Sequence, residues 1–310
     1  MRNPDATRAR WAIELESRAR AHWTEARTDE LLRGKQVLIR PADAAILLRA
    51  IGLVNGDASM PPPQVRKFLQ INHMVGMLKP AFDELRTRHP RIRLLDAGCG
   101  RSYLSLLLAW CGKHVWQHAV EVVGVDRNPA VIEECRKRAA IAELDDVCAF
   151  EAAPLEAFDP AGGTFHGVLA LHACDTATCD ALALGVGLAA ELLAVAPCCQ
   201  AELARGWAGL AERGTVGELS PIWRTPHLRR ETAAHVTDAM RALLLRAAGY
   251  DVAAIEFVPS EHTRKNTLIR AHRPAAAAPE VATTAATDYA ALVRATGGVG
   301  LALATRLGIS

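Results

Sequence analysis

Several features that would place a chain in a special class are missing from this sequence. No stretch approaches the roughly 20 apolar residues of a membrane span, and residues 1–20 contain no apolar signal-peptide core. Its eight cysteines include no CxxC pair. These absences predict a cytoplasmic chain without a membrane partner, and reduced thiols rather than a disulfide framework or a structural zinc site.

Aromatic residues and net charge are also scarce. Aromatics make up 5% of the chain, which gives no sign of the aromatic-lined pocket that apolar small molecules require. The 36 basic and 34 acidic side chains leave a net charge of +2. Any nucleic-acid surface must therefore be a local patch, and no DNA partner is expected.

The chain divides into three regions. Residues 1–60 carry helical apolar patterns, and the Pro-rich segment NGDASMPPP (55–63) marks a boundary. Residues 61–273 form the main domain. Residues 274–310 are expected to be a low-complexity tail with a short last helix within 288–306.

Strands and helices alternate in the main domain. The apolar runs 92–96, 121–126, 147–151, 166–172 and 191–196 predict strands, and the intervals 102–112, 129–143 and 176–188 predict helices. Nearly unbroken apolar strands alternating with helices are typical of a parallel sheet covered on both faces. A helix over 232–250 and an antiparallel pair, 251–258 and 267–273, are expected to close this α/β fold.

An acid and two glycines interrupt the segment LLDAGCGRSYLSLLLA (94–109). Asp96 ends the first expected strand, and Gly98 and Gly100 form the turn into the next helix. Ligands of open α/β sheets bind beyond such strand ends, and glycine lets a ligand approach the backbone closely. A second acid, Asp126, ends the next strand, where it can accept hydrogen bonds from ribose hydroxyls. The pattern predicts a nucleoside cofactor.

Details of the turn favour S-adenosylmethionine (SAM) over a nicotinamide dinucleotide. The dinucleotide fingerprint G-x-G-x-x-G requires a third glycine, and Tyr103 stands in that position. The Asp96 carboxylate also repels a pyrophosphate but suits a cationic amino group. SAM offers a ribose, an adenine and an α-ammonium group without phosphate, so we expect it to be the cofactor. A glycine turn without a ligand is the plain structural alternative.

Polar residues also follow the later strands. Cysteines and polar groups follow the strand residues in two segments, LALHACDTATCDAL (169–182) and AVAPCCQAEL (194–203). A third segment, PSEHTRKNTLIRA (259–271), includes the loop between the last two expected strands. We expect the three segments to face one crevice. Their candidate residues are His172, Cys174, Asp175, Pro197, Cys198, Cys199, Gln200, Glu261 and His262.

Together these motifs resemble class I SAM-dependent methyltransferases, in particular the Methyltransf_32-type domain found in methyltransferase-like protein 25 and the GST-C-terminal-domain-containing protein. NHM, DAGCGRSYLS, LHACDTATCDAL, APCCQ and SEHTRKNTLIRA occur in the order of that pattern over about residues 64–273. The resemblance implies a Rossmann-like fold. Its mostly parallel seven-stranded sheet would have helices on both faces and an N-terminal helical extension.

The resemblance also points to residues for the cofactor. The adenine would lie at the end of the third strand, where CAFEAAPLEAF (148–158) is similar to the third motif of these enzymes. The expected cofactor contacts are Asp96, Gly98, Gly100, Asp126, Arg127, Glu151, Ala152 and His172.

Several roles are open at the methyl acceptor. His172 with Asp175 is either a general base or a hydrogen-bonded pair that fixes a strand end. Cys198 and Cys199 point to opposite faces if extended, so one lines the crevice and the other packs as a small core residue. A nucleophilic thiol at Cys174 or Cys198 is the sharper alternative. A metal site is not expected, because no paired-ligand spacing is present.

Basic residues near the expected crevice bear on the substrate. Arg66 and Lys67 precede the first strand, and RTPHLRRE (224–231) follows Trp223. Phosphate contacts with an aromatic neighbour suit single-stranded nucleic acid, and a solvated mixed-charge surface is the alternative. The residues expected to bind substrate are Pro197, Cys199, Gln200, Glu261, His262, Arg66 and Lys67.

RNA is therefore the expected methyl acceptor. A protein side chain such as arginine is the second interpretation, and a non-catalytic SAM- or RNA-binding module or a small-molecule enzyme follow it. A distant similarity links the chain to a tRNA 2′-O-methyltransferase family with a Cys-Cys-His-His stretch. Here Gln200 and Ala201 stand in place of those histidines, so that substrate does not transfer.

Overall fold

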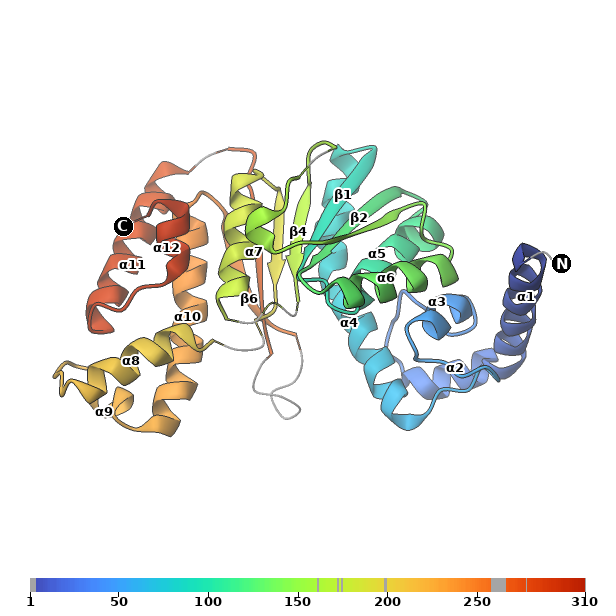
Figure 1. Ribbon diagram of the computed structural model, residues 1–310, viewed down its shortest axis with the longest axis horizontal. Helices are drawn as coiled ribbons and strands as arrows, with labels where there is room; N and C mark the ends of the chain where they lie inside the picture. Colours follow the sequence, from blue (N-terminus) through green and yellow to red (C-terminus); the bar gives the residue numbers. More distant parts are fainter. Residues whose placement is uncertain are drawn as a thin grey trace. The chain divides into compact units, whose positions relative to one another are not determined.

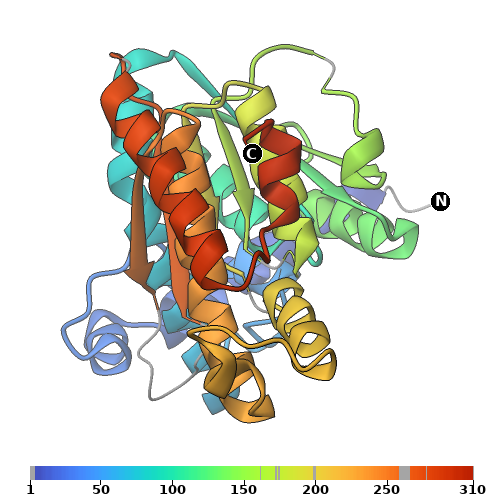
Figure 2. The same cartoon turned by 90° about the vertical axis from the view of Figure 1, so that its left-hand side faces the viewer.

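The computed structural model describes residues 4–160, 162–171, 173, 175–197, 200–257, 266–276 and 278–309, with side chains from Arg10 onward. The described residues form two compact units, coloured along the chain in Figures 1 and 2. The first comprises Met1–Ile92, Arg101–Gly124 and Asn128–Ala152, and the second Arg93–Gly100, Val125–Arg127 and Ala153–Ser310. Outside the described residues lie six expected site residues, namely His172, Cys174, Cys198, Cys199, Glu261 and His262.

Seven strands form one sheet in the order β3-β2-β1-β4-β5-β7-β6. β4 is parallel to β1 and to β5, whereas β7 is antiparallel to β5 and to β6. The strand order reverses at β1, the place where open α/β sheets bind ligands. This confirms the predicted fold class. The bounds are β1 (Arg91–Ala97), β2 (Ala119–Asp126), β3 (Cys148–Ala152), β4 (Gly167–Ala170), β5 (Leu192–Val195), β6 (Asp251–Glu256) and β7 (Thr267–His272).

The central strands are apolar because they are covered on both faces. Every residue of β4 and β5 is buried, and α7 (Thr176–Gly187) packs against them. Gly185 permits that close packing: a Cβ there would lie 2.4 Å from Leu193 Cδ2 and 3.2 Å from Val168 Cβ. The bare backbone of one residue therefore sets the distance between helix and sheet.

The first unit contains the predicted N-terminal helices and the helices next to β2 and β3. Trp23 anchors the extension, since its Nε1–H donates to the Ala58 carbonyl at 2.8 Å. Asn72 on α4 accepts a hydrogen bond from the Ile39 N–H at 3.0 Å, which holds the loop between α2 and α3 against α4. The elements are α1 (Pro4–His22), α2 (Glu25–Leu32), α3 (Ala45–Ala50), α4 (Pro62–Arg88), α5 (Tyr103–Trp110), the π-helical turn η1 (Cys111–Trp116) and α6 (Pro129–Ile141).

The second unit carries the remaining helices. Two of them, α8 (Glu202–Glu212) and the short α9 (Ser220–Trp223), occupy a stretch with no predicted element. The 3-10 turn η2 (Leu155–Ala157) and α10 (Pro226–Ala247) complete this part. No described helix combines the length and the apolar character needed to cross a bilayer.

The expected low-complexity tail is largely helical. Residues after 273 form α11 (Pro279–Ala295) and α12 (Ala302–Leu307), and α11 lies along α10 (Figure 2). Trp207 Nε1 donates to the Thr296 carbonyl at 3.1 Å, and the Ala302 N–H donates to Glu202 Oε1 at 2.6 Å. Alanine is the strongest helix former, which explains why an Ala-rich stretch folds here.

Candidate functional site

The turn after β1 has the conformation that its glycines predict. Gly98 and Gly100 have φ of +76° and +50°, in the left-handed region that side chains other than glycine rarely adopt. The N–H groups of Gly98 and Cys99 both donate to the Val125 carbonyl, at 2.8 and 2.9 Å. A Cβ at Gly100 would meet nothing within 4 Å, so the space beside that residue is open to a ligand.

Two acids flank this turn. Asp96 is only 3% exposed at the end of β1. Asp126 ends β2 half-buried, and its Oδ2 accepts from the Gly100 N–H at 3.1 Å. The Asp126 carbonyl also accepts from the Ala153 N–H at 3.1 Å, which ties the segment after β3 to the same place. The structure therefore brings together Asp96, Gly98, Gly100 and Asp126 within the second unit.

The donor set of this region fits the predicted cofactor. Buried polar groups in proteins nearly always have hydrogen-bond partners, so one without a partner calls for an explanation such as a water, an ion or a ligand. Ser102 is such a group: it has φ of +53°, is fully buried, and its Oγ has no partner among the described residues. Within the second unit, the turn thus offers open space beside Gly100 and two carboxylates.

The other expected cofactor contacts are less constrained. Arg127 is exposed directly after Asp126. Glu151 and Ala152 end β3 in the first unit and are also exposed. Their role at the cofactor stays a prediction.

Asp175 has a structural task that the sequence did not reveal. Its Oδ1 accepts from the N–H groups of Ala201 and Glu202, both at 2.9 Å, and so caps the first turn of α8. Its Oδ2 accepts from Arg205 at 2.6 Å. Asp175 itself has φ of +55°, a conformation that costs free energy in a non-glycine residue. Both carboxylate oxygens are thus engaged in holding α8.

Gln200 belongs to a buried polar network on α10. Its Nε2 donates to Asp238 Oδ2 at 2.9 Å, and Asp238 Oδ1 accepts from Arg241 at 3.2 Å. Arg241 is fully buried and also donates to the Asp175 carbonyl at 2.8 Å. Burial raises the pKa of the Asp238 carboxyl against the opposing influence of Arg241. The network fixes two expected site residues, Gln200 and Asp175, to one helix.

A small cleft beside Gln200 contains residues that the sequence reasoning missed. β7 runs antiparallel to β5, with Val195 paired to Ile269, so the start of β7 lies at the carboxyl end of β5. The sequence does carry a signal for three of them: Glu231, His235 and Asp238 are spaced i, i+4 and i+7, which places them on one face of α10. The cleft is lined by Gln200, Glu231, Ala234, His235, Asp238, Asn266 and Thr267.

Of the expected substrate residues, Pro197 is buried at the end of β5 and Arg66 is exposed on α4. Lys67 has a definite partner: its Nζ lies 3.7 Å from the centroid of the Tyr103 ring. The Arg138 guanidinium lies 5.5 Å from the same ring. Burial opposes ionisation of the Tyr103 phenol, but hydrogen bonding and charge from Lys67 bring its pKa below the usual value. Tyr103, in place of a third glycine, therefore organises two cations.

The turn, its two acids and the reversal of strand order define a nucleoside-binding α/β domain. Residues 66–206 match the model of the Methyltransf_32 family, a methyltransferase domain. The chain thus carries a methyltransferase domain and is a SAM-dependent methyltransferase. No curated protein matches the chain.

Solved structures with a similar fold are distant. Magnesium protoporphyrin IX methyltransferase (ChlM) from Synechocystis PCC 6803 with bound SAM has 16% identity and a TM-score of 0.42, over 74% of this chain and 90% of that chain. An rRNA methylase from Streptococcus thermophilus has 10% identity and a TM-score of 0.36, over 59% and 87%. The cyclase SpnF has 17% identity and a TM-score of 0.28, over 34% of this chain and 38% of that chain. Likenesses this remote say nothing about the substrate.

Proposed function

We propose that this methyltransferase modifies RNA, with a base or a ribose hydroxyl as the methyl acceptor. The observation that carries the proposal is the polar lining of the cleft beside Gln200. Side-chain amides, a hydroxyl, an imidazole and two carboxylates surround it, supplied by Gln200, Asn266, Thr267, His235, Glu231 and Asp238. The cleft measures about 20 Å³, room for a water molecule only, so these groups would offer hydrogen bonds to a nucleotide lying against them and would not enclose it.

The cofactor side of the proposal rests on the turn after β1. Asp96 would bind the α-ammonium group, and Asp126 would accept hydrogen bonds from the ribose hydroxyls. The open space beside Gly100 leaves room for the amino-acid end. Arg127, Glu151 and Ala152 would border the adenosine. SAM, when bound, supplies an electrophilic methyl group on a sulfonium.

The acceptor side needs groups that orient a nucleophile and remove its proton. Holding the nucleophile in line is worth up to about 7–11 kcal/mol, so positioning is the main task. We assign the general base to His172, which lies outside the described residues, and a positioning role to Asp175, whose carboxylate holds α8. Gln200, fixed by Asp238, would orient an exocyclic amine or hydroxyl.

The remaining expected residues keep narrower roles in the proposal. One of Cys198 and Cys199 would line the crevice. The thiol of Cys174 or Cys198 would act as a nucleophile only if the methyl acceptor is a carbon atom that needs such activation. Glu261 and His262 would reach the substrate from the loop between β6 and β7. Arg66 and Lys67 would contact phosphate.

Radiolabelled methyl transfer tests the substrate class directly. The wild-type chain is incubated with tritiated SAM and lysate from a strain that lacks the gene, and the products are treated with ribonuclease or protease. We expect label that ribonuclease removes and protease does not. Label that survives ribonuclease and is lost to protease would overturn the RNA assignment. The carboxylates of Glu231 and Asp238 would then favour a cationic protein side chain such as arginine.

A further inference from the structure

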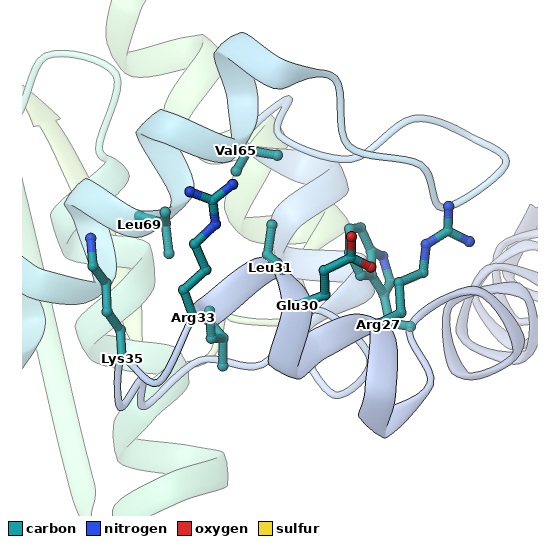
Figure 3. Close-up of a pocket in the computed structure, with 9 residues that line it drawn as sticks. Arg27, Glu30, Leu31, Arg33, Lys35, Val65 and Leu69 are labelled. Atoms are coloured by element: carbon teal, nitrogen blue, oxygen red, sulfur yellow. The ribbon is translucent and has the colours of Figure 1, made fainter.

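A second cavity lies in the first unit, between the N-terminal helices and the start of α4. It measures about 440 Å³, within the range of roughly 300–1,000 Å³ typical of ligand pockets. It is formed by α2, the loop that follows α2, and the first turns of α4 (Figure 3). Three cations, Arg27, Arg33 and Lys35, line it together with the apolar side chains of Leu31, Val65 and Leu69.

These cations differ from the paired arginines of α1 in their contacts with the residues that the structure describes. Within the part of the chain that the structure describes, the side chains of Arg27, Arg33 and Lys35 make no hydrogen bond or ion pair. On α1, by contrast, Arg10 and Arg20 lie 3.0 and 3.6 Å from glutamate oxygens. Glu30 is the single acid in the pocket lining, so cations outnumber it. The pocket is thus electrostatically prepared for an anion.

The backbone at Arg33 provides a second, independent observation. Arg33 ends α2 in the left-handed region, with φ of +48° and ψ of +47°, and Gly34 follows with φ of +78°. Glycine is the usual residue at such a helix end, because a Cβ is unfavourable there. A strained conformation held by a charged residue points to a use for its side chain.

The strained turn directs two cations to one side. Figure 3 shows the side chains of Arg33 and Lys35 extending from the loop after α2 toward the part of α4 that carries Val65 and Leu69. The Arg27 side chain points elsewhere. Arg33 and Lys35 therefore stand beside an apolar surface, an arrangement that suits a ligand with an anionic group next to a flat apolar body.

We propose that this pocket, which we call the α2–α4 pocket, binds single-stranded RNA, with a phosphate on Arg33 and Lys35 and an unpaired base on Leu31, Val65 and Leu69. The idea rests on the proposed function, since it identifies where the first unit holds the substrate. Single-stranded nucleic acid is commonly bound by cations that contact phosphates beside aromatic side chains on which bases stack, and here aliphatic side chains would provide the apolar surface. An acidic peptide would satisfy the cations but leave the apolar surface uncovered.

The test uses a fluorescein-labelled, unstructured 20-nucleotide RNA and the full chain, with binding followed by anisotropy between about 50 and 200 mM salt. In the double variant Arg33→Ala, Lys35→Ala we expect Kd to rise at least roughly tenfold. Two lost phosphate contacts should reduce the slope of log Kd against log salt by about 1.4. The matched control, Arg10→Ala with Arg20→Ala, removes the same charge from α1 and should leave affinity and slope near the wild-type values.

A substitution that separates binding from folding is Arg33→Gly. Glycine suits the left-handed conformation, so this variant should keep or raise Tm by about 1–3 °C while RNA affinity falls. A fall in Tm together with affinity would mean that Arg33 serves the fold, and would overturn the proposal. Unchanged RNA affinity and salt slope in the double variant would overturn it as well.

Methyl transfer distinguishes failure of this proposal from failure of the proposed function. With a labelled RNA substrate, the double variant should raise KM with kcat and SAM affinity unchanged. If wild type methylates RNA and the variant has the same KM, the α2–α4 pocket is wrong and the function stands. If wild type binds RNA through Arg33 and Lys35 but methylates only protein, the pocket stands and the function fails. A polyglutamate peptide that displaces the RNA and binds more tightly would identify an acidic-peptide site instead.

Discussion

Individual residues in this chain have tasks that their type alone does not reveal. Asp175 follows a strand and stands near His172 in sequence, which makes it a natural partner for a general base. Among the described residues, its carboxylate caps α8 and accepts from Arg205. That assignment depends on a contact across 26 residues of sequence, and no local pattern encodes it.

The α8 cap gives a prediction at this scale. Asp175→Ala removes an acceptor from two helix N–H groups, so we expect a loss of about 1–2 kcal/mol in the free energy of unfolding, measured by urea titration. Arg205→Ala should cost less than about 1 kcal/mol, because the Arg205 side chain is 61% exposed and its ion pair is screened by water. Equal stability of Asp175→Ala and wild type would refute the capping role.

Secondary-structure elements were the most predictable level. The apolar runs gave each strand of the sheet to within a few residues. The signature is strongest for β4 and β5, which are buried throughout, because a strand buried on both faces leaves an unbroken apolar run. The first turn was equally legible, since glycine spacing reflects the left-handed angles at Gly98 and Gly100. What the pattern missed is the polar face of α10 with Glu231, His235 and Asp238. Those residues gain meaning only from β7 and the segment after β5, which lie far off in sequence.

Packing of α7 on the sheet yields a prediction about an element. Gly185→Ala places a Cβ 2.4 Å from Leu193 Cδ2, and we expect overpacking to lower the free energy of unfolding by about 1–3 kcal/mol. Gly187→Ala lies on the same helix with nothing within 4 Å of its Cβ, so helix propensity should stabilise it by about 0.5–1 kcal/mol. Thermal melts of the two variants should therefore shift in opposite directions. A shift of the same sign in both would show that helix propensity, and not the distance to the sheet, decides.

At the scale of the molecule, chain segments distant in sequence stabilise one another. The fold class and the family followed from the sequence because motif order and apolar alternation are encoded along the chain. The folded tail did not, since alanine-rich sequence is shared by flexible and helical segments. Contacts with α8, α10 and α7 stabilise the helices of the tail. They include the hydrogen bond from Trp207 to Thr296 and the Arg306–Asp180 ion pair at 2.5 Å.

Removal of the tail tests this view of the whole chain. A chain ending at Arg273 loses α11 and α12 and uncovers apolar surface on α10, as well as the region of Trp207 on α8. Buried apolar area is worth about 25 cal/mol per Å², so we expect a lower Tm and aggregation on size-exclusion chromatography. A truncated chain with the wild-type Tm and elution volume would show that the tail is dispensable for folding.

We expect the carboxylate of Asp96, at the turn where the strand order reverses, to contribute most to the binding of SAM. Isothermal titration calorimetry of SAM into the wild-type chain and into Asp96→Asn measures its contribution, with a thermal melt of each protein confirming that it is folded. We predict 1:1 binding to wild type and at least about 100-fold weaker binding to the variant, the size expected when a buried charge-assisted hydrogen bond is lost. Unchanged SAM affinity in a folded Asp96→Asn protein would contradict the assignment of this turn as the cofactor site.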